Sequence, residues 1–237
     1  MIGALRASDG AERFSFDGKV YKIPPTTIRP QARHKGELTT RIKAGFTTEA
    51  SARMAAENGL GQMFVAGAGL DEMTAQVRRF NTIRAELGLP PDQPTTLLWM
   101  YCAETEEEAE EGWHFYANQM RAVQHHYFEW NNPGFEGVKG MEHYLKMQTA
   151  DVAVGDGIVD NHRMTQPIGT PEQVLDCIKR VQWGISLEKL VLHFFYGGMP
   201  PEKAEKSLRL FAERVLPAVH AMDTPINPAT LGVATDA

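Results

Sequence analysis

Residues 95–102 read Thr-Thr-Leu-Leu-Trp-Met-Tyr-Cys, and they predict a buried β-strand because apolar side chains fall on both of its alternating faces. The next segment predicts a long helix that runs to about Trp130, since Thr105 and Glu108 have the spacing of a capping box. A strand that is apolar on both faces and is followed by a helix is typical of a parallel sheet covered by helices. This stretch therefore indicates an α/β fold.

The same alternation of strand and helix occurs along most of the chain. Further strands are predicted at residues 41–46, 62–66 and 190–196. Further helices are predicted at residues 48–58, from Asp71 as a cap to about Leu87, from Thr170 as a second capped start, and at residues 201–220. Four such units indicate either a small open sheet or half of a (β/α)8 barrel, because a complete barrel needs eight units in about 250 residues.

Two segments lack this alternation. Residues 131–169 are irregular, with one short helix predicted at residues 138–147. The end of the chain from Thr224 is rich in proline, threonine and alanine and has no apolar periodicity, which predicts poor order. We therefore expect one partial barrel domain over residues 1–222 and a disordered tail over residues 223–237.

Composition and charge exclude several classes of protein. The chain has 237 residues and a formal net charge of -6, which argues against binding of nucleic acid through a general basic surface. No apolar run is long enough to cross a membrane, and residues 1–10 lack the apolar core of a signal peptide. We expect Cys102 and Cys177 to be buried as small apolar side chains. Two cysteines far apart in the sequence do not indicate a disulfide framework, so a reducing cytoplasm is the expected compartment.

Four segments, taken in order, resemble one known family. They are residues 14–24 with the pattern F-x-x-x-G-K-x-Y and a proline-rich link, residues 45–59 with two hydroxyl residues and an Ala-Ala pair, residues 168–174 with the pattern G-T-P-E, and residues 207–217. Together they resemble the second half of the TIM barrel of the bacterial-luciferase-like, flavin-dependent monooxygenases. The resemblance implies an α/β fold in which about four parallel strands form the C-terminal half of a (β/α)8 barrel.

The resemblance covers only the second half of the family's barrel. The family has strands one to four ahead of this point, whereas this sequence begins inside a segment that resembles helix four. A short protein, a fragment and a misplaced start codon would each give this pattern. Because strands one to four carry much of the flavin pocket in the family, the resemblance assigns no catalytic residue to this chain.

The best candidate binding site is the predicted helix start at Thr47, Thr48 and Ser51. A helix N-terminus presents free N–H groups and a partial positive charge that suit a phosphate, and hydroxyl groups there can donate to phosphate oxygens. The resemblance implies that this site holds the flavin 5′-phosphate. The alternative is that Thr47 or Thr48 simply caps the helix and that Ser51 is only exposed.

The ends of the predicted strands are the second candidate, because ligands of parallel barrels lie at the carboxyl ends of the strands. The glycines there would let a flat ring approach the backbone, or alternatively they only end the strands. The residues concerned are Ala66, Gly67, Ala68, Cys102, Tyr196, Gly197 and Gly198, of which Gly67 and Ala68 are predicted to contact the cofactor.

Other kinds of site have weaker support in the sequence. The histidines have no metal-ligand spacing, so no metal site is expected, and His193 is interpreted as a core histidine within a strand. No nucleophile elbow, phosphate-binding loop or dinucleotide glycine fingerprint occurs. The aromatic residues between His114 and Trp130 fit ordinary helix packing, an apolar substrate pocket or a subunit interface.

The resemblance implies a flavin-dependent monooxygenase that uses reduced flavin and molecular oxygen to oxygenate a small organic substrate. FMN is the expected cofactor, with the deazaflavin F420 as the alternative, and the expected partners are a flavin reductase and further copies of the chain. The rival hypothesis is a non-enzymatic flavin-binding or interaction protein, because a half-barrel leaves an edge strand and an apolar face open for association. A second copy, or a separate polypeptide with strands one to four, would cover that face.

Overall fold

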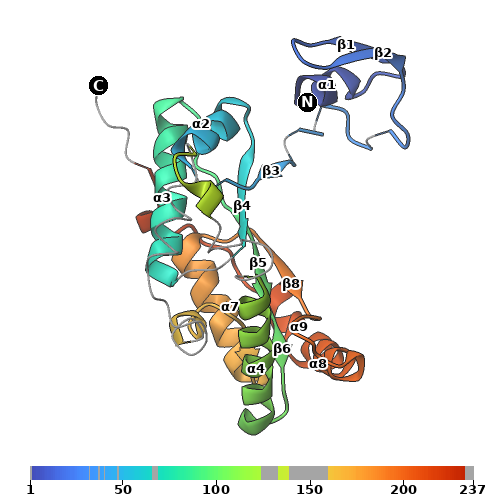
Figure 1. Cartoon of the computed structure of the whole chain (residues 1–237). Helices are drawn as coiled ribbons and strands as arrows, with labels where there is room; N and C mark the ends of the chain where they lie inside the picture. The colour runs from blue at the N-terminus through green and yellow to red at the C-terminus, as the bar shows by residue number, and fades with distance from the viewer. Residues whose placement is uncertain are drawn as a thin grey trace.

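The fold is built on one parallel sheet. The computed structural model describes residues 2–31, 33–36, 38–39, 41–46, 48–65, 69–123, 133–138 and 160–232. Four strands, β3 (Lys43–Ala44), β4 (Gly61–Val65), β5 (Thr95–Trp99) and β8 (Lys189–His193), lie in that order and are all parallel. A parallel sheet in this order with helices beside it fits an arc of a (β/α) barrel, in agreement with the predicted C-terminal half-barrel (Figure 1).

Helices connect and cover the strands. α2 (Glu49–Glu57) joins β3 to β4, α3 (Leu70–Glu86) joins β4 to β5, and α7 (Pro171–Ile185) leads into β8. The remaining helical elements are α1 (Ile2–Ser8), α4 (Glu106–Ala122), α8 (Pro201–Arg214), α9 (Leu216–His220) and the 3-10 turns η2 (Pro133–Phe135) and η3 (Pro228–Thr230). An antiparallel hairpin of β1 (Phe14–Asp17) and β2 (Lys22–Thr26) lies with α1 beside the main body (Figure 1). Among the described residues, no helix is long and apolar enough to cross a membrane.

The side chains of β5 divide the core into two layers, because alternate residues of a strand point to opposite faces of the sheet. Leu98 packs with Met73 of α3 and Val181 of α7. Leu97 and Trp99 face the other way and belong to the cluster around α4. Helices α3 and α7 thus cover one face of the sheet, and α4 covers the carboxyl end of the other face.

The single strand predicted at residues 95–102 is two strands in the structure. β5 pairs with β8 up to Trp99, which lies opposite His193. The chain then changes partner, and β6 (Tyr101–Cys102) pairs with β7 (Ile168–Gly169). The sequence pattern does not reveal β7, because this strand of two residues lies in the irregular segment. Two other predicted strands, at residues 41–46 and 190–196, are also shorter in the structure.

Most of the predicted helix starts are correct. The hydroxyl groups of Thr48, Thr105 and Thr170 each accept a hydrogen bond from the N–H three residues later, which confirms these caps. The cap predicted at Asp71 is wrong, because Gly69 is the N-cap of α3 and Asp71 lies in its first turn. A carboxylate in that turn still interacts favourably with the helix dipole, which explains the misleading signal.

The last predicted helix, residues 201–220, is divided in two. α8 ends at Arg214 and α9 begins at Leu216. Pro217 explains the break, because proline lacks an N–H and its ring collides with the carbonyl four residues earlier in a continuous helix. The helix predicted at residues 138–147, and the part of the preceding helix beyond residue 123, lie outside the described residues.

The tail that was predicted to be disordered has fixed contacts as far as Gly232. Thr230 is fully buried, and its carbonyl accepts a hydrogen bond from Asn81 Nδ2 of α3 at 2.8 Å. The Thr230 hydroxyl lies 2.7 Å from the Ser186 hydroxyl at the end of α7. These hydrogen bonds join the predicted tail to α3 and α7, and the disorder predicted for residues 223–237 stays a prediction. Residues 233–237 lie outside the described part, and the domain boundary at residue 222 stays a prediction.

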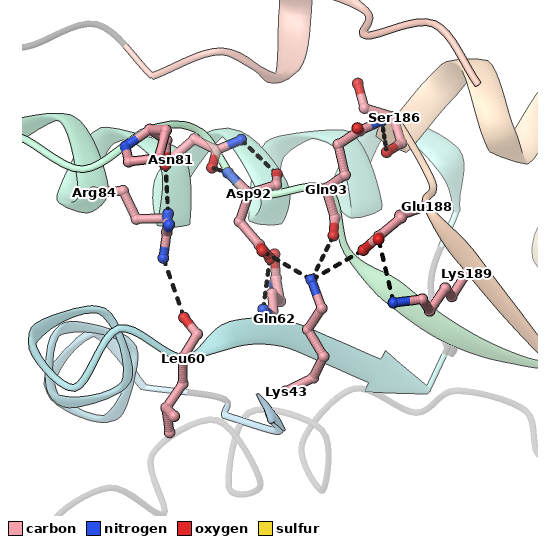
Figure 2. A network of polar contacts seen from close by, with 11 residues as sticks. Lys43, Leu60, Gln62, Asn81, Arg84, Asp92, Gln93, Ser186, Glu188 and Lys189 are labelled. Atoms are coloured by element: carbon pink, nitrogen blue, oxygen red, sulfur yellow. Dashed lines mark hydrogen bonds and ion pairs between the residues drawn. The ribbon is translucent and has the colours of Figure 1, made fainter. Parts of the chain in front are cut away.

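A polar network joins the amino ends of the four parallel strands (Figure 2). Lys43 of β3 places its ammonium nitrogen 2.8 Å from the Asp92 carboxylate and 2.8 Å from the Gln93 carbonyl, both just ahead of β5. The same nitrogen lies 3.4 Å from the carboxylate of Glu188, the residue before β8. The second oxygen of Asp92 accepts the N–H of Gln62 in β4 at 2.7 Å.

Helix α3 extends this network through Asn81. The Asn81 side chain accepts the Asp92 N–H at 2.8 Å and donates to the Asp92 carbonyl at 3.2 Å (Figure 2). The Lys43 and Asp92 side chains are only 14% and 11% exposed. Charges that are so far removed from water are stable only when they are paired, so each depends on the other.

We predict that Asp92→Ala lowers the free energy of unfolding by about 3 kcal/mol, because it leaves a poorly solvated Lys43 charge and an unpaired Gln62 N–H. Urea denaturation followed by circular dichroism measures this change. The control, Glu205→Gln, removes an ion pair with Arg209 in which the two side chains are 62% and 77% exposed. The control should change the free energy by less than about 0.5 kcal/mol, and equal losses in both variants would contradict the role given to Asp92.

Candidate functional site

The start of α2 brings together two of the predicted phosphate-binding residues. The hydroxyl oxygen of Thr48, the N-cap, accepts the Ser51 N–H at 3.2 Å. The Thr48 hydroxyl donates its own hydrogen to the Ser51 hydroxyl oxygen at 3.0 Å. Both residues are half-buried. The Ser51 hydroxyl hydrogen has no acceptor among the residues that the structure describes, so it can donate to a ligand.

The backbone of this helix start adds further donors. The first N–H groups of an α-helix have no partner within the helix, and the helix dipole gives this end a partial positive charge. α2 follows β3, so these donors lie beyond the carboxyl end of a parallel strand, where ligands of (β/α) barrels bind. The group of donors suits a phosphate, although the exposed carboxylate of Glu49 in the first turn opposes an anion.

The structure decides between some of the alternative roles of these residues. Capping is confirmed for Thr48, and Ser51 is not merely exposed, since it is bonded to Thr48. Contact with a phosphate stays a prediction for both. Three of the predicted binding residues, Thr47, Gly67 and Ala68, lie outside the described residues.

Aromatic side chains gather where β5 and β8 end. Trp99 packs edge-on against Tyr116 of α4, with ring centroids 5.6 Å apart. Tyr116 is fully buried, and its hydroxyl lies 2.5 Å from His162 Nδ1. Tyr196, which follows β8, is buried in the same cluster. Burial raises the pKa of both tyrosines, so both hydroxyl groups stay protonated. Ordinary helix packing is thus confirmed for Tyr116.

Sequence reasoning missed several members of this cluster. Trp99 of β5 and Tyr101 of β6 belong to the same buried cluster, and the alternation of residues in the sequence contains that signal. His162 and Gln166 are buried but come from the irregular segment, which gives no such signal. The Gln166 side-chain oxygen accepts the backbone N–H of Trp99 at 3.0 Å, so a loop residue from far along the chain fixes the end of β5.

The residues after β8 have a structural role. Gly197 has a φ of 62°, and a side chain there would meet the Phe115 carbonyl of α4 at 1.8 Å. Its N–H donates to the side-chain oxygen of Gln119 at 3.1 Å. Gly197 therefore ends the strand and lets the loop lie against α4. The interpretation of His193 as a core residue is wrong, because its side chain is exposed on the less covered face of β8.

A cavity of about 630 Å³ opens between α4 and α7. Arg163 lies over the Trp113 ring, 4.9 Å from its centroid, and forms hydrogen bonds of 3.1 and 3.2 Å with Glu110. The hydrogen bonds with Arg163 lower the pKa of Glu110. Arg163 and Glu110 of the cavity wall thus satisfy each other. Within the described ranges, no three His, Cys, Asp or Glu residues form a group that could hold a metal ion.

Comparisons with known proteins identify relatives of this fold. The sequence model of the luciferase-like monooxygenase family matches residues 2–186. No curated protein sequence matches the chain. A monooxygenase from Streptomyces bottropensis, RslO1, is similar in structure with a TM-score of 0.59 and 22% sequence identity, over 92% of this chain and 59% of that one.

Two further solved structures have the same fold. The oxygenating constituent of 3,6-diketocamphane monooxygenase from Pseudomonas putida, in complex with FMN, has a TM-score of 0.57 and 20% identity, over 91% of this chain and 60% of that one. The F420-dependent tetrahydromethanopterin reductase from Methanopyrus kandleri has a TM-score of 0.57 and 14% sequence identity, over 90% of this chain and 60% of that one. This chain therefore spans about 60% of the length of these structures.

We predict that neither cysteine reacts with a thiol-specific disulfide reagent in the folded protein at pH 8. Cys102 and Cys177 are both buried, as expected from the sequence, and burial raises the pKa of each thiol to about 12. Only about one thiol in ten thousand would then be a reactive thiolate. Release of the coloured thiol from the reagent measures the reaction, and concentrated urea, as the control, should make both thiols reactive. One rapidly reacting thiol without urea would contradict this prediction.

Proposed function

Because the chain belongs to the luciferase-like monooxygenase family, we propose that it is a flavin-dependent monooxygenase. The observation that carries this proposal is the start of α2, where the Ser51 hydroxyl and free backbone N–H groups lie beyond the carboxyl end of a parallel strand. We propose that Thr48 and Ser51 bind the flavin 5′-phosphate there. Thr47, Gly67 and Ala68 stay sequence-based predictions for the same cofactor.

The proposed reaction divides the work between the cofactor and the chain. Reduced flavin, when bound, supplies two electrons to molecular oxygen, so that one oxygen atom enters a small organic substrate and the other leaves as water. The chain binds and orients the reactants. Thr48 holds the Ser51 hydroxyl toward the phosphate, and the apolar cluster of Trp99 and Tyr116 packs at the carboxyl end of β5.

FMN is the proposed cofactor and F420 is the alternative. The Pseudomonas putida structure contains FMN, and the Methanopyrus kandleri enzyme depends on F420, so the fold accommodates both. A flavin reductase that supplies reduced flavin, and a cytoplasmic location consistent with two free cysteines, belong to the same proposal.

One observation favours a second candidate function. Val191 of β8 and Phe195 after it are 41% and 56% exposed, and Val191 lies on the face of the sheet that α3 and α7 do not cover. Exposed apolar groups beside an edge strand favour association with another chain. A flavin-binding or interaction protein without enzymatic activity, or an assembly of further copies of this chain, would use that face.

Oxygen uptake separates the two candidates. With FMN, NADH and a flavin reductase, we expect the chain to raise the rate of substrate-dependent oxygen consumption above that of the reductase alone. An oxygen electrode measures this rate. Flavin binding without any such increase would favour the non-enzymatic protein, and the absence of flavin binding would contradict both candidates.

We predict that Thr48→Asp weakens the binding of FMN at least about tenfold and leaves the binding of riboflavin within about twofold. Aspartate preserves the helix cap but places a negative charge beside the proposed phosphate position. Riboflavin has the same ring system without the phosphate, so the comparison isolates the phosphate contact. Quenching of flavin fluorescence on titration with protein measures both affinities.

A matched control is available in α4. Thr105 caps that helix as Thr48 caps α2, so Thr105→Asp makes the same chemical change away from the proposed site. It should leave the affinity for FMN unchanged. Equal effects of the two variants, or an equal loss of riboflavin and FMN binding in Thr48→Asp, would show that the α2 start does not bind the phosphate.

A further inference from the structure

Two buried polar atoms beyond the carboxyl ends of β5 and β8 have no hydrogen-bond partner. They are the indole nitrogen of Trp99 and the hydroxyl oxygen of Tyr196, which are unpartnered within the part of the chain that the structure describes. The two residues are only 8% and 4% exposed. Burial of a donor without an acceptor is costly, so nearly all buried polar groups in proteins are paired. Two exceptions in one cluster indicate an acceptor that the described residues do not supply.

The two donors lie on either side of His193. Trp99 is the register partner of His193 across the β5–β8 pair. The Tyr196 ring lies 5.9 Å from the His193 ring, measured between centroids. The His193 side chain is exposed, so solvent reaches the sheet face next to the two buried donors. The same end of parallel strands holds the ligands of (β/α) barrels.

The backbone around Tyr196 is held in place. The Tyr196 carbonyl accepts the Met199 N–H at 3.0 Å, and the next residue, Gly197, is bonded to Gln119 of α4. At the other donor, the N–H of Trp99 is bonded to the Gln166 side chain. The two unpaired atoms therefore belong to anchored segments, as expected of groups that position a ligand.

The chemistry of the two donors defines the ligand. An indole N–H can only donate, and burial beside Tyr116 and Tyr101 raises the pKa of Tyr196, so its hydroxyl keeps its hydrogen. Apolar and aromatic side chains surround both groups, which disfavours a charged ligand. The nearby Tyr116 hydroxyl is already paired with His162 and serves as an internal comparison.

We propose that Trp99 and Tyr196 donate hydrogen bonds to a carbonyl oxygen of an uncharged, flat molecule bound at the carboxyl ends of β5 and β8. This inference rests on the proposed function, which places a flavin ring and an organic substrate at this end of the sheet. Both molecules can present a carbonyl oxygen, and the experiment distinguishes them.

The first measurement uses the free protein and needs no flavin. Tyr196→Phe removes only the unpaired hydroxyl, so it should raise the midpoint of thermal unfolding by about 2–4 °C. Tyr116→Phe makes the same change at a paired hydroxyl and should lower the midpoint by a similar amount. A lower midpoint in Tyr196→Phe would mean that this hydroxyl has a structural partner, which overturns the proposal.

The second measurement uses two kinds of probe with a carbonyl oxygen. Acetophenone is compared with ethylbenzene, which has the ring without the carbonyl, and lumiflavin presents the flavin ring without the phosphate. A preference of the unmodified protein for acetophenone that is lost in Tyr196→Phe and in Trp99→Phe assigns the donors to the substrate. A loss of lumiflavin affinity of about tenfold in the same variants assigns them to the flavin ring.

The remaining outcomes are also decisive. If neither probe binds the unmodified protein, or if both variants bind both probes as the unmodified protein does, the proposal is overturned. Titration of Tyr196→Phe with FMN and riboflavin tests the proposed function separately, because the proposed phosphate contacts lie at the start of α2. A variant that still prefers FMN over riboflavin retains that site whatever the two probes show.

Discussion

The pairing of the Lys43 ammonium group with the Asp92 carboxylate is the constraint on which the sheet depends. Both side chains are largely removed from water, so neither charge is tolerable without the other. The groups around them belong to the segments that begin β4, β5 and β8 and to helix α3 (Figure 2). This ion pair, together with the Lys43–Glu188 ion pair and the Gln62–Asp92 hydrogen bond, thus holds the amino ends of four parallel strands in a common position.

A fixed amino end determines what lies at the opposite end of the sheet. Parallel strands that start together also end on one side, so the start of α2 and the aromatic cluster of Trp99 and Tyr196 lie beyond the same end of the sheet. The polar groups of the two ends differ. At the amino end, Lys43, Asp92 and Asn81 are paired with one another or with the backbone, and the buried Oε1 of Gln62 is an acceptor without a partner in the described part of the chain. At the carboxyl end, Trp99 and Tyr196 carry donors that are unpartnered among the described residues. Stability at one end and available hydrogen-bond donors at the other are the usual division in (β/α) barrels.

The predictions that failed share a physical cause, which is that contacts distant in sequence override local signals. Asp71 has the composition of a cap, but the chain turns into the helix two residues earlier, at Gly69. His193 occupies an apolar strand and is nevertheless exposed, because no described element covers its side of β8. Pro217 is the exception, since the break in the last helix could be predicted from the residue itself.

The alternation of strands and helices, the caps at Thr48, Thr105 and Thr170, and the resemblance to the luciferase-like family could be read from the amino-acid sequence alone, because each depends on residues close together in the chain. Three features became visible only in the folded chain. Lys43 meets Asp92, β6 pairs with β7 whereas β5 pairs with β8, and the Trp99 and Tyr196 donors are buried without partners among the described residues. These facts depend on distances between segments that are far apart in the chain. No local pattern encodes them, because burial and pairing are settled only when the strands and helices have packed.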